Sequence, residues 1–546
     1  MDKKEPNLIR QQNKKSGVVY VYEDRPYWNP TIKQSRSKRV CVGKIDPVTG
    51  DVVPTRGRRT RQSAVQASGD DQKFMPHVAF SRRFYGATYL LDQIGKITGV
   101  EADLRACFPD TYRQILSLAY YLIMEDKNPL FRFEKWGAIH KHPYGEDIPS
   151  QRSSELFASI TPGAQANFFR RQGKRRIENE YWAYDTTTIS SYSETLRQIQ
   201  FGKNKDGDDL PQLKLLLVFG EQSGLPFYYR KLAGNIPDAK TVRNFLVELD
   251  VLGFRKVKFV MDRGFYKEKN INDLYKEHLK FLIGAKISLV FVREALNSVY
   301  DAIRTFENYS PNYDVYAYTV ASEWDYKQER PYKGDVLKEK RRIYIHLYYN
   351  IGKAAEDERN MDKHLAALRE ELLSDDRKDI HQKEYAKFFD VKRMPVRGVQ
   401  VAAKDYAIQE AKRYYGFFAL ITNEKMDAWT ALELYRMKDV VEKAFGNLKE
   451  RLNLRRTLVS SEQSLDGKLF IEFVALIYLS YIHRRMQDQC LYKDYTLHEV
   501  LDKLDVIECF EYPGKDLVVG EVLEKQNVLY EKLGVEPPTS IIKCKL

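Results

Sequence analysis

Hydrophobic and polar positions follow different patterns along the chain. Residues 17–48 contain two short runs rich in Val and Tyr, at 17–22 and 39–45, and such runs predict strands. Further on, apolar residues recur every three or four positions, as they do on one face of a helix, at Tyr112, Ile115, Ala119 and Leu122. We therefore expect a basic, β-rich region with a linker over residues 1–75 and a helical region over residues 76–180.

A change of pattern after residue 180 predicts a mixed α/β sheet. Strand-like segments come first, and helices then alternate with strands up to residue 285. This order of elements is typical of an α/β fold. A further strand at 415–422 precedes a long helix. We therefore expect a core in two parts, residues 181–285 and 416–460, with an insertion domain over 286–415 between them and a helical region over 461–546 after them.

Positive charge is concentrated in short clusters. The 546 residues carry a formal net charge of +13, and residues 1–62 alone hold 15 Lys and Arg but 6 Asp and Glu. Such clusters can neutralise the phosphates of DNA. A solvated basic arm remains the alternative for each cluster, and two short helices before residue 176 leave a helix-turn-helix reader open. We therefore expect DNA binding by the N-terminal β region and by the helical region over residues 76–180, which is a predicted helical DNA-binding region. The candidate DNA contacts from these clusters are Arg36, Lys38, Arg39, Arg58, Arg59, Arg175 and Arg176.

Composition argues against several classes of protein. The apolar run at 473–482 is about half as long as a bilayer span, and the charged residues 1–15 lack the apolar segment of a secretory signal. Five widely spaced cysteines without a CxxC pair argue against a disulfide framework and against structural zinc. We expect a soluble, cytoplasmic protein with no membrane association and no nucleotide cofactor.

Three carboxylates stand out by their context. Asp185 interrupts a β-branched and aromatic strand, where a carboxylate is costly to bury unless it is paired or holds a metal. Asp262 ends an apolar strand, although an ordinary turn Asp is the commoner explanation of that position. Glu442 is spaced to share one helix face with Tyr435, Lys438 and Lys449. On periodicity alone, a surface pair of Lys and Glu explains that spacing better.

These residue types together can perform phosphoryl transfer. Two strand carboxylates and one helix carboxylate can hold two divalent ions about 4 Å apart, which clamp the attacking and leaving oxygens. Oxygen ligands of this kind suit Mg²⁺, with Mn²⁺ as a substitute. A Lys farther along the same helix would then hold the DNA backbone beside the scissile bond.

The motif resembles that of the DDE transposases of bacterial insertion sequences, in the group whose catalytic helix carries the signature Tyr-x2-Arg-x3-Glu-x6-Lys. Tyr435, Lys438, Glu442 and Lys449 occupy its four positions, and shorter matching blocks surround Asp185, Asp238, Asp262 and the strand at 416–423. The likeness runs in order from about residue 18 to residue 483. One departure is Lys438 in place of the family's Arg, which keeps the charge but loses the bidentate fork on phosphate.

The resemblance implies an RNase H-like mixed sheet flanked by helices, with an insertion domain before the last catalytic helix. It implies that Asp185, Asp262 and Glu442 are the catalytic metal ligands. It also places Tyr435, Lys438, Lys449 and Arg263 at the DNA. Within the insertion, Trp324 is a candidate for stacking on a flipped base, with packing in a core as the commoner alternative.

By the same resemblance, the protein is expected to be a transposase that binds the terminal inverted repeats of an insertion sequence. It would cleave the DNA ends by two-metal phosphodiester hydrolysis and join the 3′-OH ends to target DNA. The resemblance further implies a homodimer in a synaptic complex, associated with the nucleoid in the bacterial cytosol. Two alternatives remain open, a catalytically silent transposase-derived DNA-binding protein and an RNase H-like nuclease without strand transfer.

Overall fold

The computed structural model describes most of the chain. The residues it does not describe are 1–7, 14–17, 30–33, 47–49, 54–79, 126–128, 177–179, 192–195, 203–209, 255–256, 331, 333, 375, 395–397, 439–442, 444–445, 447–455, 458–460 and 543–546. The chain divides into two compact units, residues 1–77 and 78–546. Glu442 and Lys449 from the signature, and Arg58 and Arg59 from the basic clusters, lie outside the described residues.

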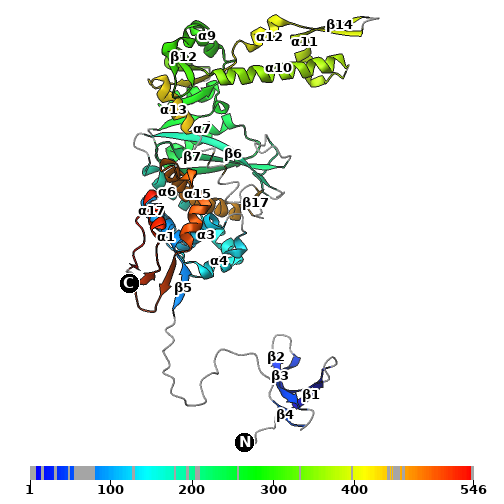
Figure 1. The fold of residues 1–546 in the computed structure, drawn as a ribbon, viewed down its shortest axis with the longest axis vertical. Helices are drawn as coiled ribbons and strands as arrows, with labels where there is room; N and C mark the ends of the chain where they lie inside the picture. Colours follow the sequence, from blue (N-terminus) through cyan, green and yellow to red (C-terminus); the bar gives the residue numbers. More distant parts are fainter. Residues whose placement is uncertain are drawn as a thin grey trace. The chain divides into compact units, whose positions relative to one another are not determined.

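The first unit is a four-stranded antiparallel sheet in the order β1-β2-β3-β4 (Figure 1). Its strands are β1 (Leu8–Gln12), β2 (Val19–Asn29), β3 (Gln34–Ile45) and β4 (Val52–Val53). The long hairpin of β2 and β3 pairs Tyr20 with Lys44 at one end and Asn29 with Gln34 at the other. The strands predicted between residues 17 and 48 are therefore present.

The second unit begins with helices around one long buried helix, α15 (Glu462–Asp488). Residues on all sides of α15 are buried, because α3, α5 and strand β8 pack against it. A helix that is apolar all round belongs inside a protein core. The surrounding elements are β5 (Ser81–Phe84), α1 (Gly86–Thr98), α2 (Val100–Cys107), α3 (Tyr112–Met124), α4 (Phe133–Ile139), α5 (Ser150–Ser159) and α6 (Pro162–Lys174).

The C-terminal elements pack on these helices. They are α16 (Leu497–Asp505), β18 (Glu508–Glu511), β19 (Leu517–Val519), α17 (Glu524–Lys532) and β20 (Ile541–Ile542). Strand β5 pairs antiparallel with β18, so that Phe84 lies opposite Glu508. Two segments more than 400 residues apart in sequence therefore complete one small sheet. Among the helices that the structure describes, none is both long enough and apolar enough to cross a bilayer.

A large mixed sheet forms the centre of the second unit, as the sequence pattern predicts. Its main order is β11-β12-β13-β16-β10-β9-β6-β7-β8, with β17 (Arg456–Thr457) beside β6. The first strands are β6 (Tyr181–Ser191), β7 (Gln212–Gly220), β8 (Pro226–Ala233), β9 (Lys258–Met261) and β10 (Lys280–Ala285). Strands β6, β7 and β8 are antiparallel neighbours, whereas β9 runs parallel to β6 and β10 parallel to β9.

The other half of the sheet comes from later segments of the chain. Its strands are β11 (Tyr309–Ser310), β12 (Val315–Glu329), β13 (Val336–Tyr349) and β16 (Phe417–Thr422). Strand β16 pairs with both β10 and β13, so β12 and β13 extend the same sheet. Helices on the sheet are α7 (Asp238–Leu252), α8 (Glu268–Lys276), α9 (Val290–Val299) and α13 (Ala428–Met437).

Between β13 and β16 the chain forms a small subdomain with its own apolar core. The α10–α12 subdomain comprises α10 (Ile351–Leu373), α11 (Gln382–Phe388), β14 (Phe389–Met394), β15 (Gly398–Ala403) and α12 (Asp405–Lys412), which lie together in Figure 1. Leu365, Leu368 and Leu372 of α10 pack against Tyr385, Phe388 and Phe389. This cluster is separate from the two clusters that hold the large sheet.

Candidate active site

Asp185 and Asp262 lie side by side on neighbouring parallel strands. The register of β6 and β9 pairs Tyr184 with Met261. Asp185 follows Tyr184 within β6, and Asp262 directly follows the last residue of β9. Neighbouring strands are about 4.8 Å apart, so the two carboxylates extend from adjacent backbones. Strand β9 ends at Met261, whereas β6 continues to Ser191 beside β7. The pair therefore lies where the sheet opens beyond the end of β9.

Helix α13 covers the face of the sheet that carries both aspartates. Side chains two or four residues apart in a strand share a face. Tyr181 and Val260, which precede Asp185 by four and Asp262 by two residues, pack with Ala431 and Leu432 of α13. One helical turn farther along this face comes Tyr435. Packing of α13 therefore directs Tyr435 toward the carboxylates.

Tyr435 and Lys438 both contact Asp262. The Tyr435 hydroxyl donates to Asp262 Oδ1 at 2.7 Å, and Lys438 Nζ lies 3.3 Å from the same oxygen. A Cβ on Gly284 of β10 would lie 2.7 Å from the Tyr435 hydroxyl oxygen. The absence of a side chain at Gly284 thus leaves room for the hydroxyl. The predicted shared face of Tyr435 and Lys438 is present, and it meets a predicted catalytic carboxylate.

The electrostatics of Asp262 favour its ionised form. Burial would raise the pKa of this carboxyl, but the Tyr435 hydrogen bond, the Lys438 ammonium and the Arg263 backbone N–H together hold it below its usual value. Burial and the nearby negative charges of Asp262 and Asp185 raise the pKa of Tyr435. Tyr435 is thus a neutral hydrogen-bond donor at neutral pH. Lys438 is 90% buried at its side chain and also lies 5.3 Å from the centre of the Tyr435 ring.

A second polar network lies beside Asp185 and begins at the next residue, Thr186. Asp185, which is 7% exposed, accepts the Thr186 backbone N–H at 2.7 Å. The Thr186 hydroxyl donates to Asp238 Oδ1 at 2.8 Å, and Lys214 Nζ donates to the same oxygen at 2.6 Å. Lys214 also donates to the Ile236 carbonyl. In the sequence, Asp238 belongs to one of the blocks that match the family, but no role is assigned to it. In the structure, its carboxylate binds Thr186 of β6 and Lys214 of β7 beside the aspartates.

A divalent cation fits the chemistry of this pair. Two adjacent carboxylates repel each other, and hard oxygen ligands are those that Mg²⁺ prefers. Within the described residues, no three His, Cys, Asp or Glu side chains are grouped to hold a metal. The third expected ligand, Glu442, follows Lys438 by four residues in the sequence and lies outside the described part of the chain.

The other predicted DNA contacts lie in different surroundings. Arg263 is exposed directly beside Asp262. Arg39 in β3 is half-exposed and pairs with Asp24 at 3.3 Å. The side chains of Arg36 and Lys38 are not among the described ones. Arg175 binds Asp103 through two nitrogens, and Arg176 is 8% exposed and donates to Gln172.

Trp324 is packed rather than exposed. Its indole N–H donates to Asn272 Oδ1 at 2.8 Å, and its ring meets Phe291 edge-on with centres 5.6 Å apart. This arrangement matches the packing alternative that the sequence left open. Stacking on a base would require the ring to leave these partners.

Comparison with known proteins shows the family of the chain. A family profile described as the transposase DDE domain matches residues 182–478, which is more than half of the chain and includes Asp185, Asp262 and Tyr435. The chain therefore belongs to the transposase DDE domain family. Among solved structures, it is similar to a piggyBac transposase synaptic complex with hairpin DNA, studied by cryo-EM. That likeness has 10% sequence identity and a TM-score of 0.31, and covers 76% of this chain and 70% of the other. No curated protein matches the sequence.

Proposed function

We propose that the protein is a metal-dependent DDE transposase whose catalytic carboxylates are Asp185, Asp262 and Glu442. The observation that carries the proposal is the side-by-side placement of Asp185 and Asp262 at the end of β9, within the segment matched by the transposase family. We infer that the strands β8-β7-β6-β9-β10 are an RNase H-like sheet. Three antiparallel strands followed by two parallel ones support that inference.

The proposed reaction is in-line displacement at phosphorus in two steps. Water would first cut the DNA at the end of the element and leave a 3′-OH, and that hydroxyl would then attack target DNA. Asp185, Asp262 and Glu442 would hold two Mg²⁺ ions, with Mn²⁺ as a substitute. These ions supply charge stabilisation for the attacking and leaving oxygens. The same carboxylates serve both steps, because neither step requires a covalent bond to the protein.

The remaining residues position these groups. Tyr435 holds Asp262 in one orientation through its hydrogen bond. Lys438 keeps a positive charge beside Asp262 at the edge where a phosphate would approach. Arg263, exposed next to Asp262, and Lys449 are proposed to hold the DNA backbone. Terminal inverted repeats and target DNA would be the partners, and two ends would be held by a homodimer in the cytoplasm.

The experiment is cleavage and strand transfer by the full-length protein on its own flanking inverted repeats. Asp185→Asn, Asp262→Asn and Glu442→Gln should each bind end DNA with unchanged affinity and lose at least 10³-fold in Mg²⁺-dependent cleavage, which is roughly 4 kcal/mol of transition-state stabilisation. Asp335→Asn is the control, because Asp335 is an exposed carboxylate paired with Arg330. Normal cleavage by any of the three variants removes that residue from the site.

The same assay separates the two alternatives. Joining of the cut 3′ ends into a plasmid distinguishes a transposase from a nuclease without strand transfer. Binding of end DNA by the wild-type protein without any cleavage in Mg²⁺ or Mn²⁺ would identify a catalytically silent DNA-binding protein and overturn the proposed chemistry.

A further inference from the structure

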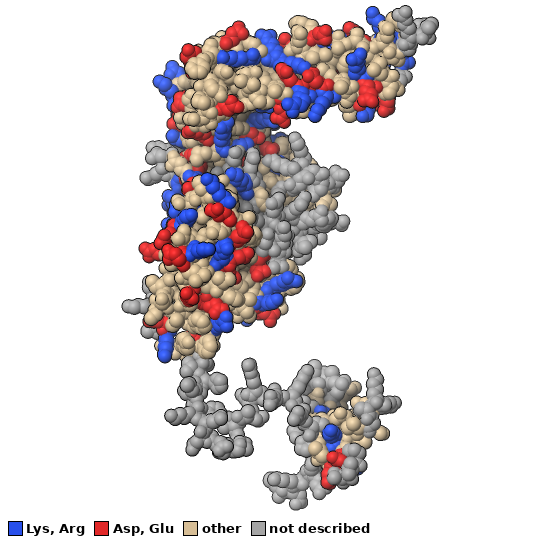
Figure 2. All heavy atoms as spheres, in the orientation of Figure 1, with Lys and Arg blue, Asp and Glu red and all other residues tan. Residues whose placement is uncertain are grey.

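An open pocket of about 470 Å³ lies between helices α2 and α6, and neither Asp185 nor Asp262 is among its lining residues. It is lined by Ala106 and Cys107 at the end of α2 and by Asn167, Arg170, Arg171 and Lys174 of α6. Three of these six residues are cations, and none is acidic. By contrast, Lys and Arg are interspersed with Asp and Glu over the face of the molecule in Figure 2.

The helical period of α6 explains how the cations gather. Residues 167, 170, 171 and 174 are spaced by three, one and three positions, so they share one face of the helix. The opposite face carries Phe168, Phe169, Gln172 and Gly173, all of which are buried. Burial of that apolar face fixes the rotation of α6 and turns the cationic face outward. Arg170 is further held by its hydrogen bond to Asn167 Oδ1 at 2.8 Å.

The two arginines that follow α6 do not belong to the pocket lining. Asp103 is 1% exposed and accepts hydrogen bonds from Arg175 Nε at 2.8 Å, Arg175 Nη2 at 2.9 Å and Gln172 Nε2 at 2.7 Å. The Arg175 guanidinium packs on Gly99, where an added Cβ would lie 2.2 Å from it. The positive φ of 73° at Gly99 also favours glycine. Of the cluster between residues 170 and 176, these contacts therefore leave Arg170, Arg171 and Lys174 to face the pocket.

The described lining of the pocket is positively charged. The C-terminal ends of α2 and α6 each carry about half a negative charge, and cations near such ends are stabilising. Arg170, Arg171 and Lys174 bring three positive charges to the pocket, and none of its described lining residues is acidic. Asp103 is not one of these lining residues, and its carboxylate is matched by Arg175. On the other wall, burial raises the pKa of the Cys107 thiol although the Arg171 guanidinium lowers it, so the thiol adds no negative charge at neutral pH.

We propose that this pocket binds backbone phosphates of double-stranded DNA, as a second contact distant in sequence from the catalytic carboxylates. Phosphates carry the negative charge that the lining lacks, and Arg side chains hold phosphate oxygens through two parallel N–H donors. The lining offers cations without an acidic acceptor for base donors, so the contact reads charge rather than sequence. The proposal rests on the proposed function only in taking DNA as the partner.

The test is the salt dependence of DNA binding by the full-length protein, measured by fluorescence anisotropy in EDTA so that no DNA is cut. In the triple variant Arg170→Gln, Arg171→Gln and Lys174→Gln, the slope of log affinity against log salt should fall by about 2 to 3, close to one for each lost phosphate contact. At 100 mM salt the affinity should fall at least tenfold, equally for end DNA and for a duplex of random sequence.

A control triple variant removes the same charge elsewhere. Arg359→Gln, Lys363→Gln and Arg369→Gln alter exposed residues of α10, and should leave the slope within about 0.5 of wild type. Asn167→Asp is a second pocket variant, isosteric with the wild type, that adds a negative charge while keeping the acceptor for Arg170. It should weaken binding at least threefold without changing the thermal denaturation midpoint.

A pocket triple variant whose slope changes no more than that of the control overturns the proposal, as does unchanged binding by Asn167→Asp. These outcomes are distinct from failure of the proposed function. A pocket triple variant that has a reduced salt slope but cleaves DNA normally with metal at saturating DNA supports both proposals. If the pocket triple variant keeps the wild-type salt slope while Asp262→Asn loses cleavage, the pocket proposal is rejected and the proposed function stands.

Discussion

The hydroxyl of Tyr435 donates a 2.7 Å hydrogen bond to Oδ1 of Asp262, across 173 residues of sequence. Helix α13 is thereby tied to the end of β9 at the residue proposed to hold a metal. Tyr435 and Lys438 both contact Oδ1, so neither of them engages the other oxygen of Asp262. Tyr435 is therefore a positioning residue for Asp262.

Tyr435→Phe keeps the ring in its packing but removes the donor. A hydrogen bond to a charged group contributes about 1.5–3 kcal/mol, so the single-turnover cleavage rate should fall roughly ten- to hundredfold. Affinity for end DNA should stay within twofold. Tyr313→Phe is the matched control, because the Tyr313 hydroxyl donates to Glu433 on the same helix. A variant with a normal rate at saturating DNA but weakened DNA binding would show that Tyr435 contacts DNA instead.

Lys438 competes with a metal for Asp262. Its ammonium lies 3.3 Å from Asp262 Oδ1, and a positive charge at that distance opposes binding of a divalent cation. Lys438→Gln should therefore lower the Mg²⁺ concentration needed for half-maximal cleavage by roughly three- to tenfold. Lys438→Arg keeps the charge and should leave that concentration unchanged. If Lys438→Gln raises it instead, the ammonium supports the site rather than competing with the metal.

The ion pair of Lys214 and Asp238 stabilises the sheet beneath the site. The Lys214 side chain is 7% exposed and donates to Asp238 Oδ1 at 2.6 Å. Asp238→Ala would leave a buried ammonium with the Ile236 carbonyl alone. Because Asp238 is itself 26% exposed, we expect a loss of about 2 kcal/mol rather than the larger cost of a fully buried pair.

The double variant Asp238→Ala and Lys214→Met should recover at least half of that loss, since it removes the stranded charge. Urea denaturation of the wild type, the single variants Asp238→Ala and Lys214→Met, and the double variant provides the measurement. Equal stability of Asp238→Ala and the wild type would contradict the role assigned to this pair.

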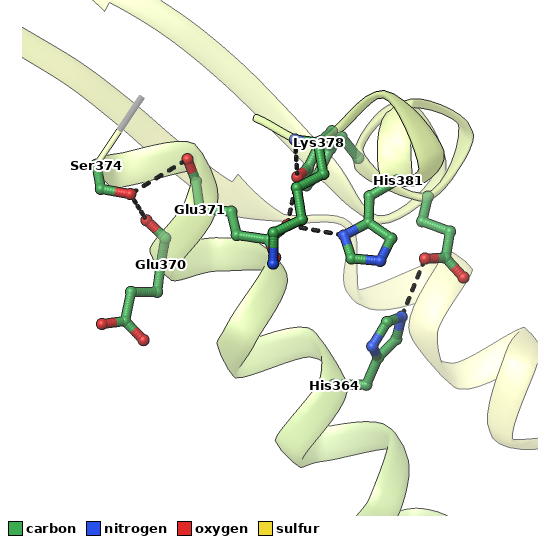
Figure 3. Close-up of polar contacts among 8 residues, drawn as sticks. His364, Glu370, Glu371, Ser374, Lys378 and His381 are labelled. Carbon is green, nitrogen blue, oxygen red and sulfur yellow. Dashed lines mark hydrogen bonds and ion pairs between the residues drawn. The ribbon is translucent and has the colours of Figure 1, made fainter. Parts of the chain in front are cut away.

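The α10–α12 subdomain should lose stability in acid. Glu371 of α10 accepts hydrogen bonds from Lys378, Tyr385 and His381, and these contacts lower its pKa to about 2 (Figure 3). A carboxyl whose pKa is lower in the folded state stabilises that state above its unfolded pKa, near 4.5. That contribution disappears as the pH falls from there toward 2.

Hydrogen exchange over α10, corrected for the intrinsic effect of pH, is the measurement. Protection of residues 365–373 should decrease between pH 5 and about pH 2.5 in the wild type. In Glu371→Gln it should be lower at pH 5 and nearly constant over the same range. Glu370→Gln is the control, because Glu370 is an exposed carboxylate directly before Glu371 on the helix. The same acid dependence in wild type and Glu371→Gln would assign it to another group.

Much of the site follows from local sequence patterns. The β-branched and aromatic residues around Asp185 indicate a strand, and helical spacing indicates one shared face for Tyr435 and Lys438. The structure adds the parallel pairing of β6 with β9, which joins Asp185 to Asp262 over 77 residues. No local period encodes such a pairing, because register between distant strands depends on the whole sheet.

Long-range pairing also explains what the sequence left unresolved. Charge density in the sequence indicates one basic cluster over residues 170–176, yet Arg175 is held by Asp103, which lies 72 residues earlier. Aromatic, strand-like segments at 313–324 and 342–349 can be recognised in the sequence, but their addition to the central sheet through β16 cannot. Pairs that meet only in the folded chain leave no spacing by which sequence reasoning can find them.

The α10–α12 subdomain is inserted into the sheet between two residues that are direct partners on neighbouring strands. Tyr349, the last residue of β13, is the partner of Phe417, the first residue of β16. Antiparallel neighbours of this kind can be joined by a turn of two residues. The whole segment between them is thus exchangeable: a short hairpin, or a module of another kind, can occupy its place without breaking a hydrogen bond of the sheet. Relatives with very different lengths at this junction can therefore share one catalytic frame.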